Sequence, residues 1–317
     1  MFENRYLIIS VTCFNILFIF SNIWLFRRAY EPVINSIKSV QYQQQFVPIL
    51  YNRVPKCAST LMKMLFVKQS RLLNFKFLEA KVYTEYKLNQ VEQKHFVNKL
   101  MNNSKTLTLF ERHIYFIDFN RHQHIQPFYI NLLRNPLERA ISDYYYSRYM
   151  CTVKRKTCFR MNLAYINETL DDCIIRNENQ PHVCTSLEHG VHSAIAFFCG
   201  QSSYCEGYKT IEEALWQAKS NIVKYYKLIG ITENLFKTFS VMEHVLPQFF
   251  ANISKLYLRQ KKKRIWETPK AYRIEPNNRT KEILYKALKY EIDLYTYVKR
   301  RLDRRYDEIF SAKKKIE

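Results

Sequence analysis

The chain has 317 residues, which is enough to bury the core of one large domain or of two small ones. Its 50 lysines and arginines outnumber its 28 aspartates and glutamates, giving a formal net charge of +22, so we expect a polyanionic partner. All four glycines lie after residue 189, which excludes the G-x-x-x-x-G-K-[ST] phosphate loop and the ATPases and GTPases that depend on it.

An uncharged apolar stretch covers residues 6–26, close to the ~20 residues that cross a bilayer as a helix. A cleaved signal peptide has a shorter apolar region, about 7–15 residues, which ends in small residues rather than in Trp24, Leu25 and Phe26. We therefore expect a transmembrane signal anchor after a cytoplasmic tail at residues 1–5. A cleaved leader and a buried helix are the alternatives. Arg27 and Arg28 follow the stretch, so the positive-inside rule alone favours the opposite orientation.

Residues 27–45 are polar and are typical of a stem, and we expect a single domain at 46–317. Strands are expected at 46–52, 81–84, 106–111, 128–133 and 226–232. Helices are expected at 60–73, 90–100, from Pro136 onwards, 234–250 and 281–305. This βαβα order predicts an α/β fold with a P-loop-like central parallel sheet, helices on both faces, and ligands at the carboxyl ends of the strands. The charge run RQKKKR at 259–264 is expected to be a loop, either solvated or in contact with a polyanion.

Four sequons are spread along the chain, with acceptors Asn102, Asn167, Asn252 and Asn278. Such asparagines receive glycans only in the secretory lumen, so they predict a luminal domain on a type II membrane protein. In that compartment the polyanion that fits the charge is a glycosaminoglycan. Nucleic acid, the commoner partner of basic proteins, is not expected there.

Seven of the eight cysteines follow the apolar stretch, and in an oxidising lumen neighbouring cysteines form disulfides. The simplest pairs are Cys173–Cys184 and Cys199–Cys205. Cys151 and Cys158 are available for a third bridge, which would leave Cys57 unpaired. A zinc site is the alternative, but these spacings lack the paired C-x2-4-C knuckles of a tetrahedral site, and we expect no metal.

The first strand-to-helix junction reads YNRVPKCAST from Tyr51 to Thr60. A loop without glycine can still bind a phosphate if small residues allow a close approach and the first N–H groups of the next helix point at the anion. Ala58, Ser59 and Thr60 are small or hydroxylic, and Lys56 supplies a mobile cation. The alternative is an ordinary turn with a serine or threonine cap.

A second junction, INLLRNPLERAISDYYY at 130–146, resembles the first in its chemistry. Arg134 ends an apolar strand, Pro136 suits the first turn of a helix, and Ser142 lies about two turns further on. Arginine binds phosphate through charge-assisted paired hydrogen bonds. Two separate phosphate sites predict a nucleotide that carries two separate phosphate groups.

Four segments together resemble the uronyl 2-O-sulfotransferases of glycosaminoglycan synthesis: YNRVPKCAST, RNPLERAIS, LFERHIYFIDF at 109–119 and FFCGQSSYC at 197–205. That group contains the heparan sulfate 2-O-sulfotransferases, the dermatan/chondroitin uronyl 2-O-sulfotransferases and the Pipe-like proteins of insects. The similarity runs in order from residue 46 to residue 310. It is therefore more specific than any of the single motifs.

The resemblance implies that the sulfate donor is PAPS, 3′-phosphoadenosine 5′-phosphosulfate. Arg134 and Ser142 would bind its 3′-phosphate, and Lys56 would neutralise the leaving phosphate oxygen. The residues expected around the 5′-phosphosulfate are Arg53, Lys56, Cys57, Ala58, Ser59 and Thr60. Asn135 and Cys57 depart from the family pattern, which commonly has Asp and Thr there, but neither change removes a charged ligand.

The resemblance also implies the groups that act on the acceptor. His113 falls on the family's catalytic histidine and would take the proton of the attacking hydroxyl, a role that suits an ordinary pKa of about 6.5. The basic residues expected to bind uronate carboxylates and sulfates are Arg53, Arg148, Lys154, Arg155 and Lys156.

The sequence therefore predicts a Golgi membrane enzyme that transfers sulfate from PAPS to the 2-hydroxyl of iduronic or glucuronic acid in heparan or dermatan/chondroitin sulfate. The resemblance also suggests a homotrimer. A catalytically inactive protein that only binds glycosaminoglycan is the main alternative. Retention of Lys56, His113, Arg134 and Ser142 together favours the enzyme.

Overall fold

The structure is a computed structural model that describes residues 46–80, 86–103, 105–156, 158, 162–185, 193–261 and 272–311. Contacts divide the chain after Gln45, and the fold below is that of the unit Phe46–Glu317. The anchor expected at 6–26 and the stem expected at 27–45 lie outside the described residues. Within the described ranges, no helix is long and apolar enough to cross a membrane.

A five-stranded parallel sheet lies at the centre of the domain, with the strand order β2-β3-β1-β4-β5. The strands are β1 (Ile49–Asn52), β2 (Lys76–Glu79), β3 (Thr108–Arg112), β4 (Phe128–Leu133) and β5 (Tyr226–Ile231). All four residues of β1 are buried, because a central parallel strand is covered on both faces. The predicted α/β fold with a central parallel sheet is confirmed.

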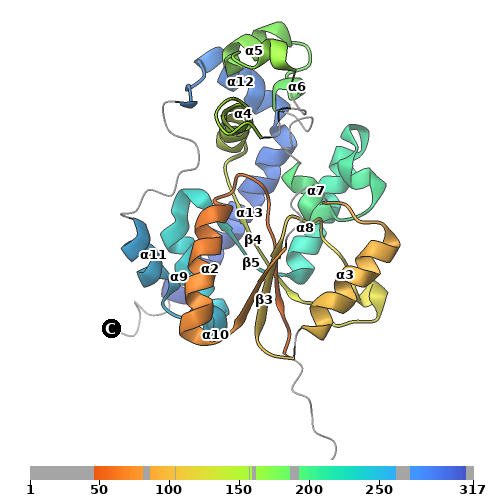
Figure 1. The fold of residues 1–317 in the computed structure, drawn as a ribbon, viewed down its shortest axis with the longest axis vertical. Helices are drawn as coiled ribbons and strands as arrows, with labels where there is room; N and C mark the ends of the chain where they lie inside the picture. Colours follow the sequence, from red (N-terminus) through yellow and green to blue (C-terminus); the bar gives the residue numbers. More distant parts are fainter. Residues whose placement is uncertain are drawn as a thin grey trace, which may run out of the picture. The chain divides into compact units, whose positions relative to one another are not determined.

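Helices cover both faces of the sheet, as Figure 1 shows. One face carries α2 (Ser59–Leu73), α9 (Leu235–Val245), α10 (Pro247–Phe250) and α11 (Ile253–Lys261). The other carries α3 (Gln90–Asn102), α7 (Ala194–Cys199) and α8 (Ile211–Tyr225). The long helix α13 (Lys289–Ser311) packs against β5, α8 and α9. Short 3-10 turns lie at Phe119–His122, Leu163–Tyr165, Ser203–Glu206, Tyr208–Thr210 and Thr232–Asn234.

A second, smaller core lies around α4 (Pro136–Thr152), at the top of Figure 1. There α4 is accompanied by α5 (Leu170–Arg176), α6 (His182–Thr185) and α12 (Asn278–Ala287). Asn135 caps α4 by accepting hydrogen bonds from the backbone N–H groups of Leu137 and Glu138, and Pro136 occupies the first turn as predicted. The cap fixes the direction in which α4 leaves the sheet.

Three disulfides stabilise this framework. The predicted bridges Cys173–Cys184 and Cys199–Cys205 are both present, as is the third bridge, Cys151–Cys158. Cys57 is unpaired and buried. The Cys173–Cys184 bridge joins α5 to α6 and therefore covalently closes the smaller core.

Several expected elements differ from the structure. The helix expected at 234–250 is two helices, because Pro247 cannot continue α9 and begins α10 instead. The helix expected at 281–305 is also two, α12 and α13, which separate at Leu288. Residues 259–261 of the expected basic loop belong to α11. The strand expected at 81–84 and residues 262–264 of the expected basic loop lie outside the described residues. The strand that precedes 81–84 in the sequence is β2.

Gly230 lets helix α9 approach strand β5 closely. An added Cβ there would overlap the Thr238 side chain on α9 and lie 3.0 Å from Leu132 Cδ1. Thr238 Oγ1 also accepts a 3.0 Å hydrogen bond from the backbone N–H of Ile231, so the helix cannot move away without losing that bond.

We expect Gly230→Ala to lower the free energy of unfolding by about 1–3 kcal/mol, the usual cost of overpacking a core. Chemical denaturation measures the loss. Thr238→Ala removes the overlapping atoms, so the Gly230→Ala substitution should cost less in that background. Equal costs in the two backgrounds would contradict the close approach described here.

Candidate active site

Three loops meet at one edge of the sheet. Strand β1 pairs in parallel with β3 on one side and with β4 on the other, so the residues that follow these strands are neighbours. The loop that contains Lys56 follows β1, His113 follows β3, and Arg134 follows β4. Positions far apart in the sequence therefore converge at the carboxyl ends of parallel strands, as the sequence predicts.

Arg53, the residue after β1, joins this loop to the end of β3 by three contacts. Its backbone N–H donates to the carbonyl of Arg112 at 3.0 Å. Its guanidinium forms an ion pair with Glu111, 3.3 Å from Nη1 to Oε1, and both side chains are buried. Its backbone carbonyl lies 2.8 Å from Nδ1 of His113.

The carboxylate of Glu111 is fully buried at the end of β3. Burial raises the pKa of Glu111 above its ordinary value, and the positive charge of Arg53 opposes that rise. An ion pair out of contact with water contributes little net stability, but removing one partner leaves an uncompensated charge. Arg53 is therefore held firmly in place, and so is the backbone that contacts His113.

The contact with Arg53 fixes the tautomer of His113. A carbonyl oxygen can only accept a hydrogen bond, so Nδ1 of the histidine must carry the proton. In the neutral ring Nε2 is then the basic nitrogen. The Tyr86 ring packs edge-on against the imidazole, with 5.8 Å between ring centroids. The contacts with Arg53 and Tyr86 thus fix the orientation of the ring.

The Lys56 loop adopts a left-handed conformation at two residues that are not glycine. Lys56 has φ 61° and Ala58 has φ 55°. Alternation of this kind turns successive backbone N–H groups toward one concavity, which is a common anion-binding arrangement. Ala58 is the N-cap of the 15-residue helix α2 and offers no side-chain acceptor to the first N–H groups. The loop is thus shaped for an anion without a glycine.

Two side chains of the loop point in different directions. The ammonium group of Lys56 lies 3.3 Å from the centroid of the Tyr146 ring on α4, a close cation–π contact. Cys57 is fully buried, and burial raises the pKa of its thiol to about 12. The thiol therefore stays protonated, so Cys57 contributes packing and its backbone N–H to the loop.

Arg134 shares a carboxylate with a second arginine. Its Nη2 lies 3.3 Å from Glu138 on α4, and Nη2 of Arg273 lies 2.7 Å from the same oxygen. Burial and then the nearby charge of Arg273 lower the pKa of Arg134. Burial alone would raise the pKa of Glu138, but hydrogen bonds and charges from the two arginines hold it below its ordinary value. Two guanidinium groups thus lie together where β4 meets α4.

The sequence profile of the sulfotransferase family matches residues 43–298. The chain belongs to the sulfotransferase family. It is 29% identical over 258 residues to human uronyl 2-sulfotransferase, covering 79% of this chain and 61% of that protein. It is 28% identical over 284 residues to heparan sulfate 2-O-sulfotransferase hst-2 of Caenorhabditis elegans, covering 80% of this chain and 78% of the relative. The chain thus spans about three fifths of the first relative's length.

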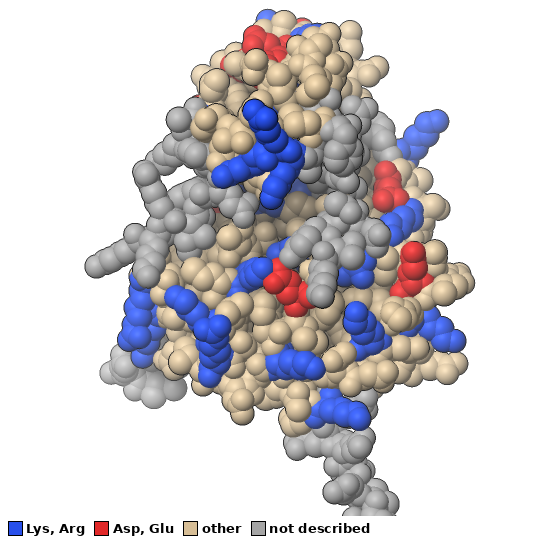
Figure 2. All heavy atoms as spheres, in the orientation of Figure 1, with Lys and Arg blue, Asp and Glu red and all other residues tan. Residues whose placement is uncertain are grey.

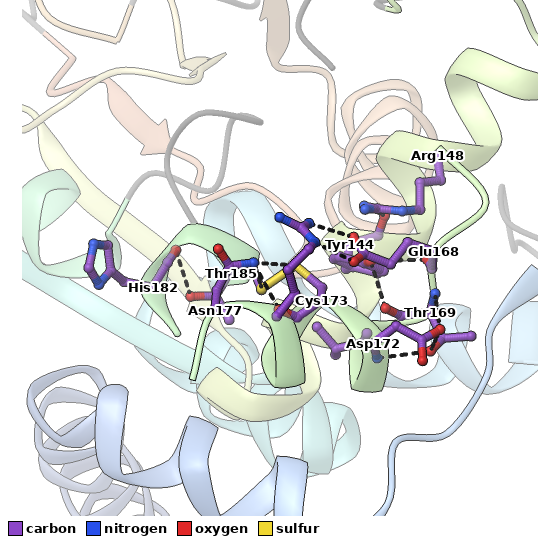
Figure 3. Close-up of a disulfide and its surroundings, with 12 residues drawn as sticks. Tyr144, Arg148, Glu168, Thr169, Asp172, Cys173, Asn177, His182 and Thr185 are labelled. Carbon is purple, nitrogen blue, oxygen red and sulfur yellow. Dashed lines mark hydrogen bonds and ion pairs between the residues drawn. A yellow bond between two sulfur atoms is a disulfide. The ribbon is translucent and has the colours of Figure 1, made fainter. Parts of the chain in front are cut away.

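Helix α4 separates the predicted donor residues from part of the predicted acceptor set. At 3.6 residues per turn, Ser142 and Tyr146 lie on one face, and Tyr146 contacts Lys56. Arg148 lies on the opposite face, where its guanidinium is 3.4 Å from the centroid of the Tyr144 ring. Figure 3 shows Arg148 beside Tyr144 and Glu168, near the Cys173 disulfide.

The basic cluster that follows α4 is exposed. Lys154, Arg155 and Lys156 lie just beyond the carboxyl end of the helix. Lys156 donates its backbone N–H to the carbonyl of Met150 at 2.8 Å, and Arg155 has φ 51°. These three residues stay a prediction as acceptor ligands, as does Arg148.

Three residues that contact the predicted site residues were not predicted from the sequence: Glu111, Tyr146 and Arg273. Tyr146 could have been found, because it follows Ser142 by four residues on the same helical face. Glu111 and Arg273 act through partners 58 and 135 residues away in sequence, and no local pattern indicates such pairs. Within the described ranges, no group of His, Cys, Asp or Glu side chains is placed to hold a metal ion.

Removing Arg53 should destabilise the fold, because Glu111 is then a buried carboxylate without its ion-pair partner. Arg53→Met leaves Glu111 unpaired, so we expect the free energy of unfolding to fall by about 3–5 kcal/mol at neutral pH. Folding raises the pKa of Glu111, so the folded protein loses stability as pH rises and the buried carboxyl ionises. Removing Arg53 raises this pKa further, because the positive charge of Arg53 opposes the rise. The gap between variant and parent should therefore widen from pH 4.5 to pH 8.

Thermal unfolding across this pH range checks the prediction. The double variant Arg53→Met with Glu111→Gln carries no buried carboxylate at this position. It should recover most of the stability at pH 8. A gap that is the same at every pH would show that the Arg53–Glu111 pair does not determine the effect.

Proposed function

We propose that this chain is a Golgi membrane enzyme that transfers sulfate from PAPS to the 2-hydroxyl of iduronic or glucuronic acid in heparan or dermatan/chondroitin sulfate. The relatives support the substrate class, since their names are uronyl 2-sulfotransferase and heparan sulfate 2-O-sulfotransferase. The observation that carries the proposal is the 2.8 Å contact between Arg53 and His113. The contact orients His113 through Arg53, which lies three residues before Lys56 in the proposed anion-binding loop.

The donor fits the two cationic junctions. The loop at Lys56 has the backbone shape for one anionic group, and the first turn of α2 favours negative charge there. Arg134 at the second junction, with Ser142 two turns along α4, would hold the 3′-phosphate. PAPS supplies an activated sulfuryl group when bound. Arg273 adds positive charge beside Arg134.

His113 would accept the proton of the 2-hydroxyl as its oxygen bonds to sulfur. The proton goes to Nε2, because Nδ1 already carries one and donates it to Arg53. The bond from sulfur to the bridging phosphate oxygen breaks, and the products are a sulfate ester and 3′,5′-ADP. Lys56 would stabilise the negative charge that develops on that oxygen. No metal ion is required for this balance of charge.

Positive charge around the site would attract the acceptor polymer. On the face shown in Figure 2, basic side chains stand around a hollow beneath the end that carries α4, α5 and α12. Sulfates and carboxylates of a glycosaminoglycan are the anions that such a surface attracts in the secretory lumen. Arg53, Arg148, Lys154, Arg155 and Lys156 are the candidate acceptor ligands.

Glycosylation sites and disulfides support the proposed compartment. Asn102, Asn167, Asn252 and Asn278 are all exposed, so each is accessible to glycan attachment. The three disulfides suit an oxidising lumen. We include in the proposal a signal anchor at 6–26, a luminal domain at 46–317 and a homotrimer, for which the family resemblance is the support.

His113→Ala should lower kcat by roughly 10²–10⁴-fold, the range for losing a positioned general base. Its affinity for 3′,5′-ADP should change little, because the donor contacts are elsewhere. Lys56→Ala should lower both turnover and affinity, because its charge acts on the bound donor and on the leaving group. Steady-state kinetics and calorimetry on the two variants side by side measure this difference.

His124 provides the matched control. Its Nε2 lies 2.8 Å from Asn98 on α3, so its ring is engaged away from Arg53. His124→Ala should therefore keep nearly full turnover. Full turnover in His113→Ala with an unchanged pH profile would show that the base is another residue, and binding of 3′,5′-ADP without any transfer by the parent would favour the inactive alternative.

A further inference from the structure

A groove lined by basic residues lies where α8 and α13 meet the outer edge of the sheet. Strand β5 is last in the strand order, and both helices pack beside it (Figure 1). The groove has a volume of about 350 Å³, within the range of sites that bind small molecules. We call it the basic groove, because among the described residues that line it Glu308 alone is acidic and four are basic: Lys227, Arg301, Arg304 and Arg305.

The positive charges of the basic groove are largely uncompensated. The spacing i, i+3, i+4 and i+7 places on one face of α13 the residues Arg301, Arg304, Arg305 and Glu308. Glu308 lies 3.7 Å from Arg305. Within the described ranges, no ion pair reaches Lys227, Arg301 or Arg304. Like charges at this spacing repel each other and destabilise a helix, so a bound anion would relieve the repulsion.

The floor of the basic groove is apolar. It is formed by four buried side chains: Ile222, Leu228, Val298 and Leu302. The basic residues stand exposed at the rim, and a floor of low polarity strengthens the attraction between their charges and an anion in the groove. A sulfated sugar fits both parts, because its C–H groups can pack on the floor while its sulfates meet the guanidinium groups.

The basic groove is separate from the candidate active site. Near the start of α13, Glu291 pairs with Arg139 of α4, close to the junction that contains Arg134. Residues 301–305 follow Glu291 by 10–14 residues, or roughly 15–21 Å along a helix that rises about 1.5 Å per residue. The groove also borders residues 226–229, which begin β5, whereas the candidate site lies at the carboxyl ends of the strands. A ligand in the groove therefore leaves the candidate active site open.

We propose that the basic groove is a second glycosaminoglycan site, which binds a sulfated stretch of the same polymer whose uronic acid reacts at the candidate active site. The choice of occupant rests on the proposed function, which makes a sulfated polysaccharide the polyanion of the compartment. One long polymer chain can occupy both sites, and binding at one raises the effective concentration of the chain at the other. The groove thus lowers KM for long chains and leaves the chemical step unchanged.

Removal of charge from the groove tests its affinity for the polymer. Arg301→Gln with Arg304→Gln changes two exposed side chains, so the fold should be kept. Calorimetric titration of the full chain with long heparin chains, without a sulfate donor, measures the binding. We expect the groove variant to bind about tenfold more weakly than the parent, because each exposed ion pair contributes a factor of about three.

A control variant with the same loss of charge is Lys94→Gln with Lys99→Gln. Both lysines are exposed on α3, which lies on the other side of the sheet order from β5, and this variant should bind heparin as the parent does. Equal affinity of the parent and the groove variant for heparin would overturn the proposal. An equal loss of affinity in the control variant would also overturn it, because the effect would then be one of net charge.

Kinetics with PAPS separate the groove from the reacting sugar. In the groove variant, KM for the long polymer should rise about tenfold with kcat unchanged. KM for a trisaccharide with a single uronic acid should stay at the parent value, because so short an acceptor occupies the candidate active site alone. A matching rise in KM for the trisaccharide would overturn the proposal, since the arginines would then act at the reacting sugar.

Two further outcomes distinguish the alternatives. If the groove variant loses binding to phosphatidylserine vesicles but keeps its affinity for heparin, the groove binds a membrane and the proposal is wrong. If the parent binds heparin through the groove but transfers no sulfate to any acceptor, the proposed function is wrong and the groove remains a glycan-binding site.

Discussion

The site depends on how Arg53 joins two strands. Its side chain pairs with Glu111 at the end of β3, while its own backbone continues from β1. A buried carboxylate cannot be left unpaired without a large cost, so the guanidinium has little freedom. The carbonyl of the same residue orients His113. A single buried ion pair thus fixes the position of the Lys56 loop relative to His113.

The loop after β1 adopts, without glycine, a left-handed backbone that glycine usually supplies. Left-handed backbone at Lys56 and Ala58 costs of order 1–3 kcal/mol each, because a Cβ crowds that conformation. Buried neighbours compensate the cost: Val54 and Cys57 are fully buried on either side of Lys56. A loop held in this shape would need little reorganisation to bind the proposed donor, which would favour affinity.

Local signals in the sequence were sufficient for most of the fold. Apolar runs located β4 and β5, and Pro136 located the start of α4. Pro247, which begins α10, is a local signal of the break that the helix expected at 234–250 does not take into account. The break at Leu288 has no proline or glycine to signal it. Pairings over long sequence separations, such as Arg139 with Glu291, arise from tertiary packing, which no local pattern encodes.

In the proposed reaction, the base oriented by Arg53 and the lysine of the glycine-free loop act together on a uronic acid 2-hydroxyl. The most direct test incubates the full chain with labelled PAPS and desulfated heparan, dermatan or chondroitin polymers, followed by disaccharide analysis. We expect label on the 2-oxygen of the uronic acid in at least one polymer. Label confined to the amino sugar, or no transfer to any of these polymers, would contradict it.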